Sequence, residues 1–110
     1  MTVIEYCAAN GRCPYREWLD TLDKTDKARV SARIQRFREG NLGDHKAGSN
    51  GVCEARMFFG PGYRIYFGRE VSTLLVLLLG GDKQSQKRDI IRAGWLWSEY
   101  LMEKRHGSTS

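Results

Sequence analysis

Hydrophobic positions in the first 39 residues predict one strand followed by two helices. Val3–Cys7 is largely β-branched or aromatic, which is typical of a short strand. Pro14 suits the first turn of a helix, because the apolar residues that follow it recur every three or four positions. Asp23 or Thr25 can cap a second helix that runs to about Glu39.

The middle of the chain predicts three consecutive strands. Residues 40–51 are rich in glycine and have no apolar periodicity, so we expect a loop there. Val52–Phe59 and Tyr63–Gly68 flank a Gly-Pro-Gly sequence, which predicts a β-hairpin with a three-residue connection. Leu74–Leu79 is apolar at every position, as expected of a central strand that is covered on both faces.

A third helix completes the expected fold. Asp82 or Ser85 can cap a helix that runs toward Lys104, and residues 105–110 are expected to form a flexible tail. The element order β-α-α-β-β-β-α over residues 1–104 predicts a single α+β domain. We expect a mostly antiparallel four-stranded sheet with the helices packed on one of its faces.

The last helix carries more apolar side chains than one side of a small sheet can cover. One stripe should belong to the core. The other, carrying Trp95 or Trp97, is free to contact a partner protein or a second copy of the chain, with deeper burial in the monomer as an equal alternative.

Strand alternation predicts an apolar face and a polar face for the hairpin. If Phe59 pairs with Tyr63 across the turn, Arg56 lies opposite Tyr66. Side chains two residues apart then share a face. The polar face consists of Glu54, Arg56, Arg64 and Tyr66.

Two interpretations of this polar face are open. Arg56 can simply pair with Glu54 or stack on Tyr66 as part of a solvated surface. However, Lys83 leaves the same end of the predicted sheet, and Lys46 offers a further cation. Because neighbouring cations repel one another, their gathering favours a surface that faces an anion.

The overall charge agrees with an anionic partner. The 110 residues include 18 Lys and Arg against 13 Asp and Glu, a net charge of +5. Arginine outnumbers lysine by 12 to 6, and the forked guanidinium group suits phosphate oxygens better than an ammonium group does. These numbers favour nucleic acid among the possible partners.

The cysteines and the amino terminus predict a cytoplasmic protein. Cys7, Cys13 and Cys53 are odd in number and have no CxxC spacing, which argues against a disulfide framework and a zinc knuckle. The first residues lack the pattern of a signal peptide, and the longest apolar run is too short to cross a bilayer. We therefore expect a reducing environment and no membrane association.

Two segments carry a resemblance to a known family. The stretch EARMFFGPGYRIYF at positions 54–67, followed by LLLGGDKQSQKRDI at 77–90, resembles the HigB-like "addiction module killer" branch of the RelE/ParE toxin superfamily. The resemblance implies a RelE-like fold and a type II toxin that a cognate antitoxin protein neutralises. It also implies cleavage of messenger RNA on the ribosome, without a metal or another cofactor.

The resemblance further implies roles for individual residues. Arg64 stands where ribonuclease members of the family bind the scissile phosphate, and Arg56 and Lys83 match two further basic positions. Asp89 stands where many relatives have a tyrosine, so the resemblance does not identify the general base.

Tyr66 and Lys46 are our candidates for the missing base, unless the ribosome itself orients the message. The cations that metal-free RNA cleavage requires are otherwise present, because Arg64 can clamp the phosphate and Lys83 can protonate the leaving oxygen.

The second predicted helix offers another basic surface. Arg29, Arg33 and Arg36 recur at helical spacing and are expected to grip RNA without sequence preference.

Three alternatives remain at this point. ParE-like members of the same superfamily poison DNA gyrase, so the shared scaffold does not decide the activity. A plain nucleic-acid-binding module also fits the charge. Asp44 with Glu54 and Arg56 faintly imitates a metal-dependent nuclease, although arginine stands where that pattern has lysine.

Overall fold

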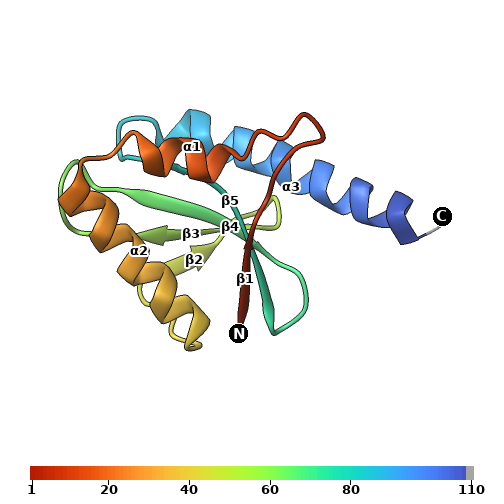
Figure 1. The fold of residues 1–110 in the computed structure, drawn as a ribbon, viewed down its shortest axis with the longest axis horizontal. Coiled ribbons are helices and arrows are strands. Elements are labelled where there is room, and N and C mark those ends of the chain that lie inside the picture. Colours follow the sequence, from red (N-terminus) through yellow and green to blue (C-terminus); the bar gives the residue numbers. More distant parts are fainter. Residues whose placement is uncertain (109–110) are drawn as a thin grey trace.

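A five-stranded sheet forms the centre of the molecule, and helices cover both of its faces. The structure is a computed structural model that describes residues 1–108. Its strands are β1 (Thr2–Glu5), β2 (His45–Ala47), β3 (Val52–Arg56), β4 (Arg64–Arg69) and β5 (Leu74–Gly81). Its helices are α1 (Pro14–Asp20), α2 (Lys24–Arg38) and α3 (Gln86–Ser108) (Figure 1).

The sheet is mixed but mostly antiparallel, as predicted for this α+β chain. Its strand order is β1-β5-β4-β3-β2, and β1 runs parallel to β5 while the other neighbours are antiparallel. The expected number of four strands was wrong, because β2 forms within the 40–51 segment that we predicted to be a loop. This strand pairs Lys46 with Glu54, and it is too short and too polar to show an alternating apolar pattern.

The structure has two separate hydrophobic cores, one on each face of the sheet, whereas the sequence predicted helices on one face only. Helices α1 and α2 pack on one face of the sheet, where Leu19 and Phe37 contact a cluster that includes Phe67. Helix α3 packs on the opposite face, where Trp97 joins a cluster that includes Val76. The expectation of helices on one face was wrong, whereas the prediction that β5 is buried on both faces is confirmed.

The hairpin of β3 and β4 is shifted by two residues from its predicted register. Arg56 lies opposite Arg64, and Glu54 lies opposite Tyr66. Residues 57–63 therefore form a longer connection than the three residues expected. Because the shift is an even number of residues, every side chain keeps its predicted face.

The helix boundaries follow the predicted signals at most ends. Asp23 caps α2 by accepting a hydrogen bond from the amide of Asp26 at 2.8 Å. Helix α1 begins at Pro14 as predicted. Helix α3 continues past Lys104 to Ser108, so most of the predicted tail is helical, and residues 109–110 lie outside the described part of the chain.

A disulfide bond joins Cys7 to Cys13, which corrects the expectation that the cysteines are not paired. A tight turn brings the two residues together, because the amide of Ala8 donates to the carbonyl of Arg12 and the amide of Gly11 donates to that of Ala8. An odd number of cysteines does not exclude one local pair. Cys53 is free and half-buried, and burial raises the pKa of its thiol.

Within residues 1–108, the helices are too short or too polar for any of them to span a bilayer.

Candidate functional site

Three of the predicted cations meet at one end of the sheet. Arg56 faces Arg64 across β3 and β4, and Arg64 faces Gly81 across β4 and β5. Lys83 follows two residues later in the turn toward α3. We call Arg56, Arg64 and Lys83 the cation row.

Gly62 shows how closely two members of the row approach. A Cβ atom on this residue would lie 3.2 Å from Nη1 of Arg64 and 3.5 Å from Cβ of Lys83. Gly62 also has a φ of +76°, a conformation that side-chain-bearing residues seldom adopt. The Arg64 guanidinium donates to the carbonyl of Gly62 at 2.6 Å, so this turn fixes its orientation.

Glu54 lies beneath the surface and contacts Arg64 of the row. Its carboxylate lies 3.5 Å from Nε of Arg64 and 3.7 Å from Nζ of Lys46, and it accepts a 2.7 Å hydrogen bond from Gln86. The side chains of Glu54 and Arg64 are only 5% and 10% exposed, whereas that of Lys46 is 60% exposed. The Arg64 charge is therefore balanced inside the protein, and Lys46 remains at the surface.

Tyr66, one of the two predicted base candidates, is completely buried. Burial, followed by the neighbouring carboxylates of Glu54 and Asp89, raises the pKa of its phenol far above the ordinary value. The phenol therefore stays protonated at neutral pH and lies away from solvent. This placement is unfavourable for a base that must reach an RNA hydroxyl.

Buried polar atoms without hydrogen-bond partners concentrate around the row. Among the described residues there are five such side-chain atoms, and four of them belong to Glu54, Arg56, Arg64 and Tyr66. Most buried polar groups in proteins are satisfied, so each of these atoms needs an explanation, and the two arginine Nε atoms lie 3.3 and 3.5 Å from the carboxylates of Asp44 and Glu54.

Asp44 supplies a second carboxylate beside the row. Its side chain lies 3.3 Å from Nε of Arg56, and both side chains are about two-fifths exposed, at 40% and 39%. The backbone carbonyl of Asp44 accepts hydrogen bonds from the Arg56 amide at 3.0 Å and from Arg33 at 2.8 Å. Backbone contacts therefore hold this exposed carboxylate next to a cation.

The predicted RNA-gripping arginines of α2 have different environments, and Arg33 does not face RNA. Its guanidinium is buried and donates to the carbonyls of Leu42, Asp44 and Arg56 at 2.8–2.9 Å. The expectation for Arg33 was wrong because helical spacing alone cannot tell a solvent-facing position from one beneath a loop.

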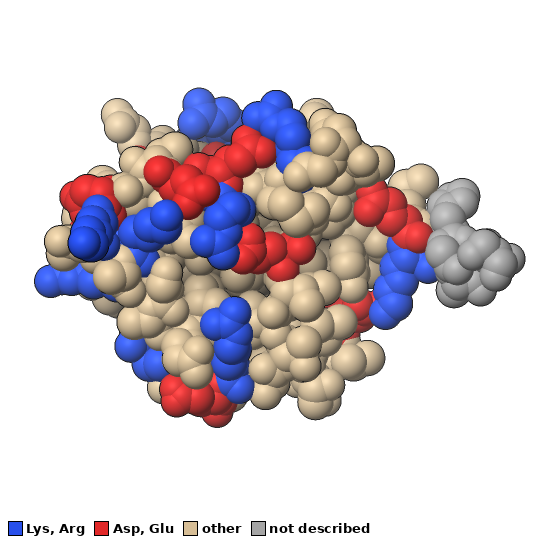
Figure 2. Space-filling view, viewed as in Figure 1, with Lys and Arg blue, Asp and Glu red and all other residues tan. Residues whose placement is uncertain are grey.

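Arg29 and Arg36 are exposed, as the RNA-gripping hypothesis requires. The Arg29 guanidinium lies over the ring of Phe59, 5.1 Å from its centroid. On the face seen in Figure 2, basic side chains are interspersed with acidic ones over the helices. The charge on this face is therefore mixed even though the net charge of the chain is positive.

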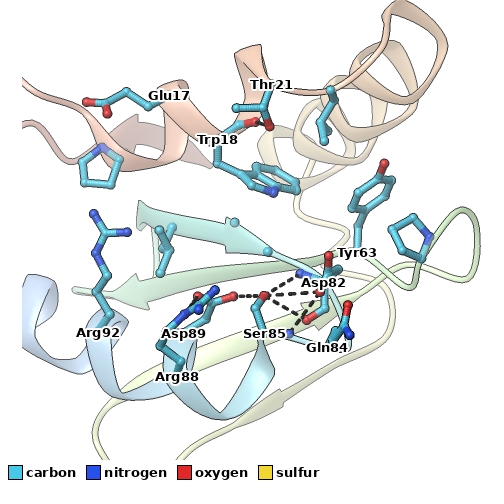
Figure 3. A pocket seen from close by; sticks show the side chains of 16 residues that line it. Glu17, Trp18, Thr21, Tyr63, Asp82, Gln84, Ser85, Arg88, Asp89 and Arg92 are labelled. Carbon is cyan, nitrogen blue, oxygen red and sulfur yellow. Dashed lines mark hydrogen bonds and ion pairs between the residues drawn. The ribbon is translucent and has the colours of Figure 1, made fainter.

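A cleft of about 720 Å³ lies beside this site and was not predicted (Figure 3). Trp18 of α1 points into it from one side, and Ser85, Asp89 and Arg92 border it from the turn and helix α3. The predicted site residues do not line it, although Gly81 and Asp82 lie between it and the cation row. No residue-spacing motif marked this cleft in the sequence.

A small hydrogen-bond network fixes the cleft's floor. The Ser85 hydroxyl donates to the carboxylate of Asp89, and the Ser85 amide donates to Asp82 at 3.0 Å. Asp89, which the resemblance places where many toxin relatives have a tyrosine, is thus buried in a hydrogen-bond network.

Glu54 and Asp44 are the two candidate-site carboxylates whose partners the sequence did not predict. Alternation placed Glu54 on the correct face, but it did not show that this carboxylate binds Arg64 rather than Arg56. Asp44 lies in the segment that lacked any periodic signal, directly before strand β2, so only the folded structure reveals its contact with Arg56.

No protein-family model matches the chain. The chain is 41% identical over 86 residues to an uncharacterized protein of Haemophilus influenzae (strain ATCC 51907 / DSM 11121 / KW20 / Rd). The matched segment covers 77% of this chain and 87% of that relative.

Proposed function

The chain belongs to the same family as the Haemophilus influenzae protein, and from the residues of its own sequence and site we propose that it is a RelE-like, HigB-type toxin. It acts in the cytoplasm as an endoribonuclease that cleaves translated messenger RNA on the ribosome, without a metal. A cognate antitoxin neutralises it. The segments at 54–67 and 77–90, which resemble HigB-like toxins, suggest the class, and the arrangement of the site supports the chemistry.

The observation that carries this proposal is the cation row. The row gathers Arg56, Arg64 and Lys83 from two strands and the following turn. The Nε atoms of both arginines face carboxylates, at 3.3 Å from Asp44 and 3.5 Å from Glu54, so each arginine is already oriented by an acidic partner. A phosphate oxygen is the acceptor that two such guanidinium groups bind best.

The row supplies two of the three groups that RNA cleavage needs. The 2′-oxygen attacks phosphorus, and Arg56 and Arg64 stabilise the charge that develops on the five-coordinate phosphate. The bond to the 5′-oxygen then breaks, and Lys83 gives that oxygen its proton. The products are a 2′,3′-cyclic phosphate and a free 5′-hydroxyl.

Asp44 is the best placed group to remove the 2′-hydroxyl proton. It is an exposed carboxylate next to Arg56, and its backbone is fixed by Arg33. Lys46 is the second candidate because it is exposed, whereas Tyr66 is enclosed in the core. Arg29 and Arg36 add a general electrostatic grip on RNA.

The test is cleavage of a translated message in a reconstituted translation system. We expect wild-type protein to cut the message with a chelator present, and only when ribosomes translate it. Asp44→Asn should slow cleavage by about 10²–10⁴-fold, because it removes a general base. Lys46→Gln is the matched comparison and should have a much smaller effect.

The result also separates the alternatives. Cleavage that stops with the chelator contradicts the metal-free mechanism. If Asp44→Asn cleaves as fast as wild type while Lys46→Gln is slow, Lys46 is the base. Intact messages together with inhibited gyrase supercoiling contradict the ribonuclease proposal and favour the ParE-like activity. RNA binding without either activity favours the plain binding module.

A further inference from the structure

Helix α3 carries an exposed apolar stripe along the side that faces away from the sheet. Ile91, Trp95 and Met102 are 61%, 71% and 59% exposed. The opposite side of the same helix is buried, with Ala93 and Trp97 in the core. The stripe is therefore not needed for packing within the monomer.

The spacing of the stripe is that of a helix that pairs with another helix. Ile91, Trp95, Ser98 and Met102 are separated by four, three and four residues, which is the spacing of the apolar seam of a coiled coil. The carboxyl-terminal half of α3 also projects beyond the sheet, where a second helix can approach it (Figure 1).

The charges that flank the seam specify the partner and its direction. Arg92 and Glu99 occupy equivalent flanking positions on the same side of the seam, and both are exposed. In an antiparallel pair of two copies, Arg92 of each copy meets Glu99 of the other. A parallel pair would instead bring Lys87 near Arg92, which repel each other.

Side-chain size agrees with the antiparallel arrangement. The same register places the large Trp95 of one copy opposite the small Ser98 of the other. It also places Ile91 opposite Met102, beside a surface hollow of about 550 Å³ that Ala8, Ala9 and Met102 help to line. Trp95 therefore faces a small side chain, whereas Ile91 faces Met102 beside this hollow.

We propose that α3 forms an antiparallel dimer between two copies of this chain. The seam of Ile91, Trp95, Ser98 and Met102 is its centre, and two symmetry-related Arg92–Glu99 ion pairs fix its direction. The inference does not depend on the proposed ribonuclease activity.

The test is the molar mass of the full chain in solution, measured by sedimentation equilibrium over a concentration series. Wild type should approach twice the monomer mass of 12.6 kDa as its concentration rises. Trp95→Glu should weaken the dimer by at least about tenfold, since it places a charge in the seam. Val71→Glu, at a 67% exposed position outside α3, is the control and should dimerise as wild type does.

Charge reversal tests the direction of pairing. Arg92→Glu and Glu99→Arg should each weaken the dimer, and the combination of both should restore it, because the ion pairs reform with opposite sign. A monomeric wild type at every concentration overturns the proposal and leaves the stripe to a different protein. Failure of the double variant to regain dimerisation overturns the antiparallel register.

Discussion

The positive charges of the arginines in α2 and in the sheet are compensated by different groups. Arg33 in α2 is buried against three neutral backbone carbonyls. Arg64 in β4 is buried beside the carboxylate of Glu54, and Arg56 in β3 pairs with Asp44 near the surface. The first arginine secures a loop, whereas the other two belong to a charged cluster.

This difference separates structural arginines from those suited to chemistry. Both Arg33 Nη atoms donate to backbone carbonyls, and loss of this side chain would remove hydrogen bonds from neutral acceptors. Loss of Arg64 would leave a buried carboxylate with less compensation, which costs more. The paired acids also give the sheet cluster the acid–base capacity that a row of cations alone would lack.

The largest expected effect is that of Arg64→Ala. This change leaves Glu54 buried without its arginine, so the free energy of unfolding should fall by about 3–5 kcal/mol. Among molecules that remain folded, cleavage should fall by about 10²–10³-fold, because a group that stabilises the transition-state charge is gone. Urea denaturation and single-turnover cleavage at a temperature where both proteins are folded measure the two effects.

Arg56→Ala is the matched control for stability. Its ion pair with Asp44 is two-fifths exposed, so the free energy of unfolding should change by only about 0–1 kcal/mol. If Arg64→Ala and Arg56→Ala lower the free energy of unfolding equally, the buried and the exposed ion pairs do not differ in their contribution to stability.

A smaller effect is expected in α2. Arg33→Met should lower the free energy of unfolding by about 1–3 kcal/mol, because three hydrogen bonds to backbone carbonyls are lost, one of them buried. Arg36→Met changes an exposed position on the same helix and should stay within about 0.5 kcal/mol of wild type. Thermal or urea unfolding of the two variants decides the point, and equal stability would contradict a structural role for Arg33.

The smallest effect is expected for Tyr66→Phe. The Tyr66 hydroxyl is buried without a hydrogen-bond partner, so its removal should leave the stability unchanged or slightly higher. Cleavage should also persist if Asp44 rather than Tyr66 is the base. A folded Tyr66→Phe variant that no longer cleaves RNA would show that the tyrosine hydroxyl takes part in cleavage.

The sequence pattern was sufficient for most elements and for the faces of the hairpin. Helix α2, the cap at Asp23 and the doubly buried β5 follow from local spacing, which tertiary packing did not override. Arg64 and Glu54 lie on the predicted face although the predicted register was wrong. The register differs by two residues, which is the period at which side chains return to the same face.

The missing parts depend on contacts between distant segments. Strand β2 forms only because β3 offers it an edge, and the burial of Arg33 depends on a loop that crosses above it. The Cys7–Cys13 bond depends on a local turn that the cysteine count did not reveal. The ion partner of each sheet arginine is likewise a property of the folded arrangement.

The most direct test of the central claim is the mapping of messenger RNA ends after brief expression of the protein in bacteria. Wild type should create new ends inside translated reading frames, and these ends should disappear when translation is blocked or when Asp44→Asn is expressed at the same level. Intact messages in cells that wild-type protein has arrested, with broken or relaxed chromosomal DNA, would contradict the account.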